Sequence, residues 1–214
     1  MLFDLDGTLI DSAPDLAGAA NDMRQLRGLQ PMPYAVLRPH AGSGARGMLG
    51  MAFGLAPGHP GYEPMRDEFH DRYERRMLHL TRVFDPVPTV LAALKRHALP
   101  WGIVTNKSMR FALPLACALA ELAGHDVVVG GDTTPHAKPH PAPLLEAARQ
   151  LRCDPARCLY VGDDPRDMQA ARAAGMGAVA AAWGYLGLDE PVQAWGADRV
   201  LHHPAELLQY LELA

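Results

Sequence analysis

The sequence contains little cysteine and no long hydrophobic run. Among its 214 residues are three cysteines, at positions 117, 153 and 158. Their number is odd, they lie in apolar contexts and their spacing is not that of a metal site, so we expect buried thiols in a reducing cytoplasm. No apolar run reaches the roughly 20 residues of a membrane-spanning helix, and the first residues are typical of a core strand rather than of a signal peptide. These absences favour a cytoplasmic protein without a membrane partner.

A surplus of basic charge is also missing. Lys and Arg number 20 and Asp and Glu 24, which gives a formal net charge of -4 and a pI of about 6.2. A chain with this charge has no basic surface to spare for nucleic acid or for an anionic membrane. Hydrophobic residues make up 49% of the chain, which is enough for one substantial core and a small accessory domain.

The most informative segment is DLDGTLIDS, residues 4–12. If Met1–Leu5 forms a strand, its side chains alternate, so Asp4 and Asp6 point the same way where the strand ends. Gly7 then allows a sharp backbone turn beside a ligand. Two carboxylates placed in this way suit phosphoryl transfer, because one can attack while the other handles a proton.

Two other structures share this pattern of acids and glycine. Acidic residues followed by glycine form ordinary turns, and they also begin calcium-binding loops. A calcium loop needs oxygen ligands at alternating positions and a closing glutamate, whereas Leu9 and Ile10 follow here. The calcium loop is therefore excluded, and a plain turn is the alternative to a catalytic site.

Three further segments carry polar side chains next to predicted strands. They are WGIVTNK (residues 101–107), AKPHPAP (137–143) and CLYVGDDPRD (158–167). The first ends on Thr105 and Asn106, which are able to bond phosphate oxygens, and the second holds Lys138 in a loop as a point charge for phosphate. The third ends in Asp163, Asp164 and Asp167, and such hard oxygen donors suit magnesium.

Each of these segments also has a simpler interpretation. Thr105 and Asn106 could cap a helix, Lys138 could be a solvated loop lysine, and the acids of residues 163–167 could cap a helix through its dipole. Taken together, the segments favour a site, because strand ends of one parallel sheet converge on the edge where open α/β sheets bind ligands.

The order of the predicted elements indicates an α/β fold. Beyond the first strand, apolar strand runs fall at residues 101–105, 126–129, 158–162, 178–182 and 199–201, and helical stretches alternate with them at 109–122, 143–151 and 166–174. This is the pattern of a doubly wound, Rossmann-like parallel sheet. The residues between the first two strands show helical spacing without a convincing strand. We therefore expect a catalytic core of residues 1–12 and 85–214, with an inserted helical cap domain at 13–84.

The four segments resemble the four motifs of the haloacid dehalogenase superfamily, in the order that the superfamily has them. The resemblance implies that Asp4 is a nucleophile forming an aspartyl-phosphate and that Asp6 is the general acid and base. It further implies that Thr105 holds the phosphoryl oxygens and that Lys138 orients the nucleophile and offsets charge.

The same resemblance implies a magnesium site. Asp163 would bind the ion together with Asp4 and the backbone carbonyl of Asp6. A Gly-Asp-Asp and an Asp-x-x-x-Asp pattern are both present; we place Asp167 in the metal set, and Asp164 stays open as the alternative. Because clustered carboxylates raise one another's pKa, a divalent cation and a lysine are needed if Asp4 is to stay ionised.

The presence of Asp6 decides between two activities of that superfamily. Dehalogenases usually lack an aspartate at this position, since a halide leaves without a proton, so Asp6 favours a phosphatase of a small-molecule phosphate monoester. A sugar phosphomutase with the same nucleophile is an alternative, and so is a non-catalytic binding protein, although that class would be expected to lose a motif acid. We expect a monomer or a homodimer.

Within the superfamily the chain is similar to the phosphoglycolate phosphatase group, through GGDTTPHAKPHPAPLL and VGDDPRDMQAARAAG. A narrower similarity, through SGARGM, WGIVTNKSMRF and WGYLGLDEP, is to its N-acetylmuramic acid 6-phosphate phosphatase branch. In the cap, the glycine-rich turn of residues 40–49 offers backbone amides and Arg46 to an anion. We therefore expect Ser43, Gly44 and Arg46 to bind substrate, with a plain helix start as the alternative.

Overall fold

The computed structural model describes residues 1–187 and 190–213. Leu188 and Asp189, which belong to the segment WGYLGLDEP, lie outside the described residues. The chain forms two compact units, one of residues 1–10 with 83–214 and one of residues 11–82. We call them the core unit and the inserted unit.

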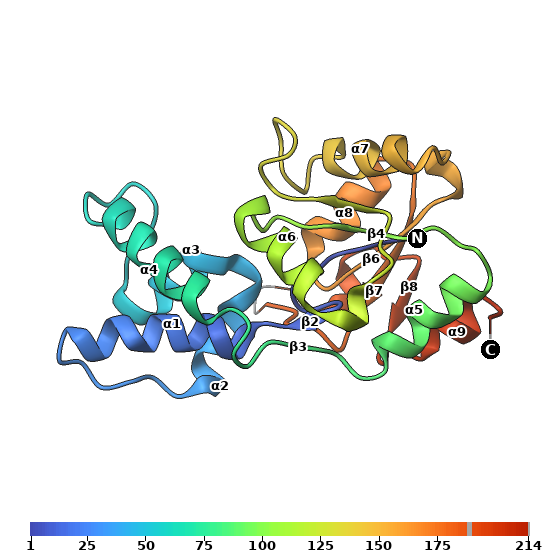
Figure 1. Ribbon diagram of the computed structural model, residues 1–214. Helices are drawn as coiled ribbons and strands as arrows, with labels where there is room; N and C mark the ends of the chain where they lie inside the picture. Colours follow the sequence, from blue (N-terminus) through green and yellow to red (C-terminus); the bar gives the residue numbers. More distant parts are fainter. Residues whose placement is uncertain (188–189, 214) are drawn as a thin grey trace. The chain divides into compact units, whose positions relative to one another are not determined.

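The core unit is built on a parallel sheet (Figure 1). Its strands are β1 (Leu2–Phe3), β4 (Gly102–Val104), β5 (Val127–Val129), β6 (Leu159–Gly162), β7 (Gly177–Ala181) and β8 (Arg199–Leu201). They lie in the order β5-β4-β1-β6-β7-β8, and every pair between neighbours is parallel. Runs such as VVV in β5 are apolar on both faces, as expected for strands that helices cover on both sides. The doubly wound parallel sheet predicted from the sequence is confirmed.

Helices cover both faces of this sheet (Figure 1). They are α5 (Val87–Arg96), α6 (Met109–Ala118), α7 (Ala142–Leu151), α8 (Pro165–Ala173) and α9 (Glu206–Tyr210), with short 3₁₀ turns at Ala120–Leu122, Pro155–Arg157 and Val192–Ala194. Leu144 of α7 and Met168 of α8 share one buried cluster with Leu2 and Tyr160 of the sheet. The helices α5 and α9 contact each other and lie on the other side of the sheet in Figure 1.

The strand order places β1 at the point where the chain changes direction. After β1 the chain continues on one side of it to β4 and β5, and then crosses to β6, β7 and β8 on the other side. In the register, Leu2 pairs with Gly102 of β4 and with Tyr160 of β6. Ligands of open α/β sheets bind at the carboxyl ends of the strands beside such a switch point. The carboxyl ends of β1, β4 and β6 are therefore the place to look for a site.

The inserted unit is helical. It contains α1 (Ala13–Leu26), α2 (Tyr34–Leu37), the 3₁₀ turn Arg38–Ser43, α3 (Gly44–Phe53) and α4 (Tyr62–Arg76). Helix α1 buries Leu16, Ala19, Ala20 and Met23, a spacing that places them on one face. A proline lies in its first turn, where proline is favoured. An acid in the first turn and Arg24 in the last turn have the signs of charge that the helix dipole favours.

Three local features differ from expectation. Two short strands, β2 (Ile10–Asp11) and β3 (Arg82–Val83), pair with each other near the bounds of the inserted unit, where we predicted none. Helix α6 ends at Ala118 rather than continuing to residue 122, and Cys117 near its end is exposed rather than buried.

Among the described residues, no helix has both the length and the apolar character needed to cross a bilayer.

Candidate active site

The nucleophile candidate, Asp4, directly follows β1. Its backbone N–H still donates to the Val161 carbonyl at 2.8 Å, so the residue is held in the plane of the sheet. Its Oδ1 atom accepts hydrogen bonds from the Leu5 N–H at 2.7 Å and from Lys138 Nζ at 3.1 Å. Within the described part of the chain, its Oδ2 atom accepts none. One oxygen of Asp4 is therefore fixed, and the other is available for chemistry.

Three buried carboxylates meet at this edge. Asp4, Asp163 and Asp167 each offer one oxygen, and these oxygens lie within 4.8 Å of one another. Burial raises the pKa of Asp163 well above its ordinary value, and the charges of Asp4 and Asp167 add to the rise. Burial also raises the pKa of Asp167 to about 7, against the opposing charge of Lys138. Such a concentration of buried negative charge calls for a cation.

Lys138 supplies part of that positive charge. Its Nζ atom lies 2.7 Å from Asp167 Oδ1 and 3.1 Å from Asp4 Oδ1. Burial alone would lower the pKa of this lysine, but the charges of Asp167 and Asp4 raise it above its ordinary value. The ammonium therefore stays charged between the two acids.

A buried tyrosine, which the sequence interpretation missed, holds Lys138 in place. The Tyr160 hydroxyl accepts a hydrogen bond from Lys138 Nζ at 2.6 Å and donates one to the Val104 carbonyl at 2.6 Å. It also lies 3.3 Å from Asp167 Oδ1. The sequence feature that could have indicated this role is a tyrosine, with its polar hydroxyl, within the otherwise apolar run of β6. Tyr160 therefore fixes the direction of one N–H of the ammonium. The other acceptors around Nζ are the two carboxylates and the Val104 carbonyl, which lies 3.1 Å away.

Replacing Tyr160 by phenylalanine is expected to lower kcat by about tenfold and to leave KM nearly unchanged, because it removes one partner of Lys138. The same loss should reduce the free energy of unfolding by about 1 kcal/mol. Kinetics with p-nitrophenyl phosphate and thermal melts measure the two effects. Tyr73→Phe, which removes a buried hydroxyl from the inserted unit, is the matched control. An unchanged kcat in the Tyr160 variant would show that this hydroxyl serves stability alone.

The residues after β4 form a braced turn. The Thr105 hydroxyl accepts from the Lys107 N–H at 3.2 Å, so this buried side chain stands at the strand end. Asn106 uses its amide differently from our expectation of a phosphate contact: Nδ2 donates to the Lys138 carbonyl and Oδ1 accepts from the Lys138 N–H, both at 2.9 Å. Neither residue caps a helix, since Ser108 precedes α6. Asn106 thus joins the turn to the loop that carries Lys138.

Asp6 lies beside a second lysine. Its Oδ1 atom is 3.0 Å from Lys107 Nζ, and both side chains are largely buried, with 14% and 9% of their surface exposed. The sequence interpretation named Thr105 and Asn106 but passed over Lys107, the next residue. Its position directly after the two polar residues at the strand end is the feature of the sequence that could have indicated a place in the site.

The two acids left open by the sequence have different partners. Asp164 forms an ion pair with Arg166 at 2.7 Å and accepts from the Arg166 N–H, which caps the start of α8. Although burial would raise the pKa of Asp164, the Arg166 guanidinium holds it below its usual value. Asp167 belongs to the carboxylate cluster. Its Oδ1 lies 2.7 Å from Lys138 Nζ, and its Oδ2 accepts from the Asp164 N–H at 3.1 Å. The helix-capping alternative is thus partly right: both acids cap α8, and Asp167 reaches the cluster as well.

Two glycines bring the backbone close to Asp163. Gly7 has a φ of +80°, and a Cβ atom built there would lie 2.0 Å from Asp163 Oδ2; one built at Gly184 would lie 2.2 Å from Asp163 Cβ. The carboxylate itself accepts from Thr8 Oγ1 at 3.1 Å and from the Tyr185 N–H at 2.7 Å. Any larger residue at these glycines would displace Asp163.

The segment after β7 also supports this site. Trp183 donates from its indole N–H to the Thr8 carbonyl at 3.0 Å, so it ties the exit of β7 to the loop after β1. The two aromatic residues of this segment therefore act on the site through one indole donor and through the backbone N–H that Tyr185 gives to Asp163.

The cap residues predicted to bind substrate lie in the inserted unit. Ser43 ends the 3₁₀ turn and precedes α3 without a side-chain capping bond, and Gly44 has a φ of +55°. Arg46 is exposed in the first turn of α3. Their contact with substrate stays a prediction.

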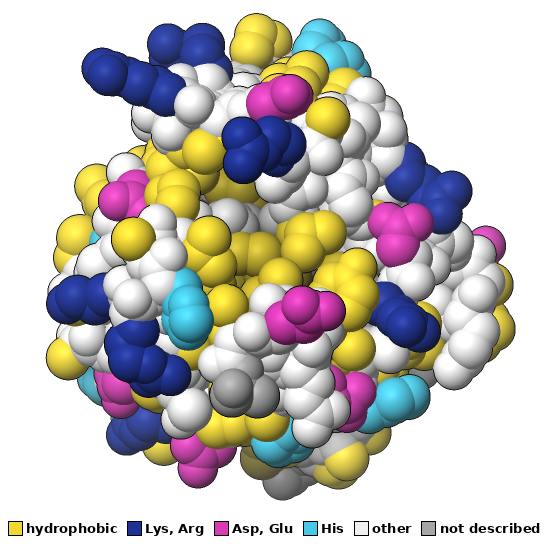
Figure 2. Space-filling model, turned by 90° about the vertical axis from the view of Figure 1, so that its right-hand side faces the viewer, with side chains coloured by type: hydrophobic (Ala, Val, Ile, Leu, Met, Phe, Trp, Pro, Cys, Tyr) yellow, Lys and Arg dark blue, Asp and Glu magenta, His cyan; other side chains and the backbone are white. Residues whose placement is uncertain are grey.

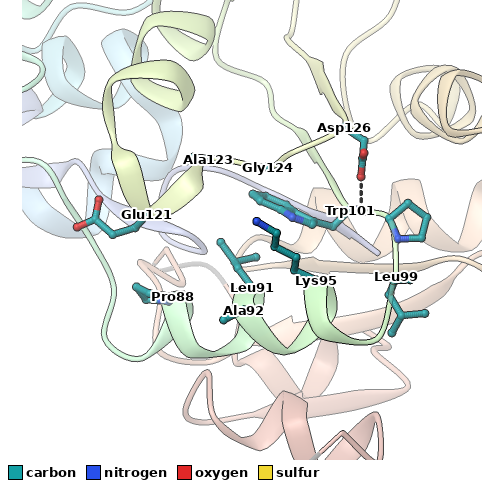
Figure 3. Close-up of a pocket in the computed structure, with 12 residues that line it drawn as sticks. Pro88, Leu91, Ala92, Lys95, Leu99, Trp101, Glu121, Ala123, Gly124 and Asp126 are labelled. Carbon is teal, nitrogen blue, oxygen red and sulfur yellow. Dashed lines mark hydrogen bonds between the residues drawn. The ribbon is translucent and has the colours of Figure 1, made fainter.

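A pocket of about 530 Å³ in the core unit lies away from this edge. It is lined by residues of α5 and by Trp101 and Asp126, which precede β4 and β5. Figure 3 shows the Trp101 ring beside Leu91 and Lys95, and the backbone N–H of Trp101 donates to the Asp126 carboxylate. On this side of the molecule, hydrophobic side chains gather in a hollow (Figure 2). The catalytic candidates follow their strands, so this pocket belongs to the opposite edge of the sheet.

Comparison with known proteins gives this arrangement a family. A family model described as haloacid dehalogenase-like hydrolase matches residues 1–181. The chain belongs to this family. The match covers all four segments that led us to the resemblance, and with it the whole carboxylate cluster of this haloacid dehalogenase-like hydrolase.

Two relatives of this haloacid dehalogenase-like hydrolase align with nearly the whole chain. It is 42% identical over 214 residues to N-acetylmuramic acid 6-phosphate phosphatase of Pseudomonas aeruginosa, covering 100% of this chain and 95% of the relative. It is 44% identical over 208 residues to phosphoglycolate phosphatase of Xanthomonas campestris pv. campestris, covering 97% and 93%. A crystal structure of a predicted phosphoglycolate phosphatase from Haemophilus somnus superimposes with a TM-score of 0.85 at 27% identity, covering 98% of this chain and 96% of that one.

Proposed function

We propose that the protein is a phosphomonoester hydrolase that works through a covalent aspartyl-phosphate on Asp4. The observation that carries this proposal is the state of the Asp4 carboxylate. Its Oδ1 is held by the Leu5 N–H and by Lys138, while Oδ2 has no hydrogen bond from a described residue. A nucleophile fixed in this way meets a substrate without having to reorganise.

The donor set of the site fits a magnesium ion. Asp4, Asp163 and Asp167 offer buried carboxylate oxygens close together, and carboxylates are the ligands that this hard cation prefers. These three residues, with the backbone carbonyl of Asp6, would hold the ion. When bound, magnesium neutralises charge that develops on the phosphoryl oxygens.

The residues of the chain account for both halves of the reaction. Asp4 Oδ2 attacks phosphorus, the bond from phosphorus to the ester oxygen breaks, and Asp6 gives its proton to the departing alkoxide. Asp6 then takes a proton from water, which attacks the aspartyl-phosphate and releases inorganic phosphate. Thr105 bonds the phosphoryl oxygens, and Lys138 keeps Asp4 oriented throughout.

The substrate class we propose is a small anionic phosphate ester, with phosphoglycolate first. The Xanthomonas relative, named a phosphoglycolate phosphatase, supports this choice. N-acetylmuramic acid 6-phosphate is the second candidate, since the Pseudomonas relative is named for that activity and aligns with this chain over 95% of its length. We propose that the inserted unit is a helical cap, in which Ser43, Gly44 and Arg46 bind the substrate's second anionic group.

Specificity constants for the two esters test this assignment. We expect phosphoglycolate to be preferred by more than about tenfold, and Arg46→Ala to lower kcat/KM for its better substrate by about tenfold or more, the cost of a charged hydrogen bond. Lys95→Ala, an exposed residue on α5 of the core unit, is the control. A preference for the sugar ester would replace the first candidate by the second, and an unchanged constant in the Arg46 variant would remove Arg46 from the site.

A further inference from the structure

Lys107 occupies a fixed place next to the proposed acid and base. Its backbone N–H bonds Thr105 Oγ1 at 3.2 Å, and its carbonyl accepts from the Gly131 N–H at 2.9 Å. Gly131 packs so closely on this turn that a Cβ atom there would lie 2.3 Å from the Asn106 carbonyl oxygen. The ammonium, 3.0 Å from Asp6 Oδ1, therefore extends from a turn that is braced on both sides.

The two lysines of the site form ion pairs with different carboxylates. Lys138 Nζ contacts Asp4 and Asp167, on the side of the nucleophile and the carboxylate cluster. Lys107 Nζ contacts Asp6, which in the proposed reaction faces the ester oxygen of the leaving group. Lys107 is thus a cation on the leaving-group side. In the proposed reaction Thr105 bonds the phosphoryl group, Lys138 orients Asp4, and a magnesium ion held by the carboxylate cluster would neutralise charge on the phosphoryl oxygens.

We propose that Lys107 is a further cation for the second anionic group of the substrate: it binds a carboxylate carried on the carbon next to the ester oxygen, so that the core, as well as the proposed cap, selects phosphate esters of 2-hydroxy acids. This inference rests on the proposed function and deepens it by naming the substrate class. An ammonium has three donors on one point charge, so it can bond Asp6 and a substrate carboxylate together.

The two candidate esters differ in how far their carboxylate lies from the ester oxygen. In phosphoglycolate a single methylene lies between the ester oxygen and the carboxylate. Lys107 lies beside Asp6, so it can bond the carboxylate while Asp6 bonds the ester oxygen. In N-acetylmuramic acid 6-phosphate the lactyl carboxylate lies across the sugar ring from the ester oxygen. Lys107 therefore favours the first ester and gives the second no advantage from its carboxylate.

Two substrate pairs test this inference in Lys107→Met. The first pair is phosphoglycolate and 2-hydroxyethyl phosphate, which has the same length but no carboxylate; the second is N-acetylmuramic acid 6-phosphate and N-acetylglucosamine 6-phosphate. We expect kcat/KM for phosphoglycolate to fall about 10-fold to 100-fold more than that for 2-hydroxyethyl phosphate, the cost of one charged hydrogen bond. Both sugar esters should fall by the same factor. Lys107→Arg, which keeps the charge, should restore much of the difference within the first pair.

The controls separate a failure of this inference from a failure of the proposed function. Lys95→Met, on the opposite edge of the sheet, should change none of the four constants. Equal losses for phosphoglycolate and 2-hydroxyethyl phosphate in Lys107→Met would overturn the role of Lys107 and leave the phosphatase intact. If the wild-type protein releases phosphate from none of the four esters, the proposed function fails, and the inference that rests on it fails too.

Discussion

Replacing Asp4 by asparagine is expected to lower phosphatase turnover by at least about a thousandfold, because no other group in the site can form the covalent intermediate. The fold should survive, since asparagine has the same shape and can still accept from the Leu5 N–H through its oxygen. Steady-state release of phosphate measures the loss. Rapid acid quenching should trap a phosphorylated peptide containing residue 4 from the wild-type protein and none from the variant.

Asp67→Asn is the matched control for this result, because it makes the same chemical change on exposed helix α4 of the inserted unit. Its turnover should stay within about twofold of wild type. Near-normal activity in Asp4→Asn, or a phosphopeptide from elsewhere in the chain, would disprove the assignment of the nucleophile.

Asp163→Asn is expected to make the metal-free protein more stable while abolishing its response to magnesium. Without a cation, Asp163 is buried beside two other carboxylates, and its pKa is raised well above the ordinary value. A neutral amide removes that repulsion. It also fits the local hydrogen bonds, since its oxygen can accept from the Tyr185 N–H and its amide can donate to Thr8 Oγ1.

Thermal melts with and without magnesium measure this effect. Magnesium should raise the melting temperature of the wild-type protein, as a ligand that binds the folded state does, but not that of the variant. Chelation should abolish wild-type turnover, magnesium should restore it, and calcium should inhibit, because its larger and looser shell misplaces the nucleophile. Full activity after exhaustive chelation, or a magnesium response in Asp163→Asn equal to that of wild type, would contradict the proposed metal site.

The meeting of Asp4 and Asp163 follows from rules that are visible in the sequence. Apolar runs mark the strands, and parallel strands place their carboxyl ends on one edge, so polar residues just beyond those runs lie near one another. Lys138 and Asp167 are different: Lys138 lies in a loop well beyond β5, and Asp167 lies in the first turn of α8. Their place in the site, 2.7 Å from each other and with Lys138 3.1 Å from Asp4, was expected only from the resemblance to the superfamily motifs.

The supporting contacts could not be obtained in this way. Tyr160 reads as one more large residue of a buried strand until Lys138 is seen against its hydroxyl. The amide of Asn106 could equally have faced a ligand, and its pairing with the Lys138 backbone depends on how two loops approach each other. Hydrogen bonds between loops are set by tertiary geometry, which local patterns do not encode.

Asp167 has a consequence for anyone who wishes to re-engineer this enzyme. One of its oxygens receives the Asp164 N–H at the start of α8, and the other faces Lys138. Exchange of this residue to alter the preference of the proposed metal site would therefore also remove a hydrogen bond from the first turn of α8, which packs on β6 and β7. A library that varies residue 167 alone would not distinguish a change at the proposed metal site from a loss of helix stability. Varying it together with position 164, so that another capping residue can take over, would let the two properties be redesigned separately.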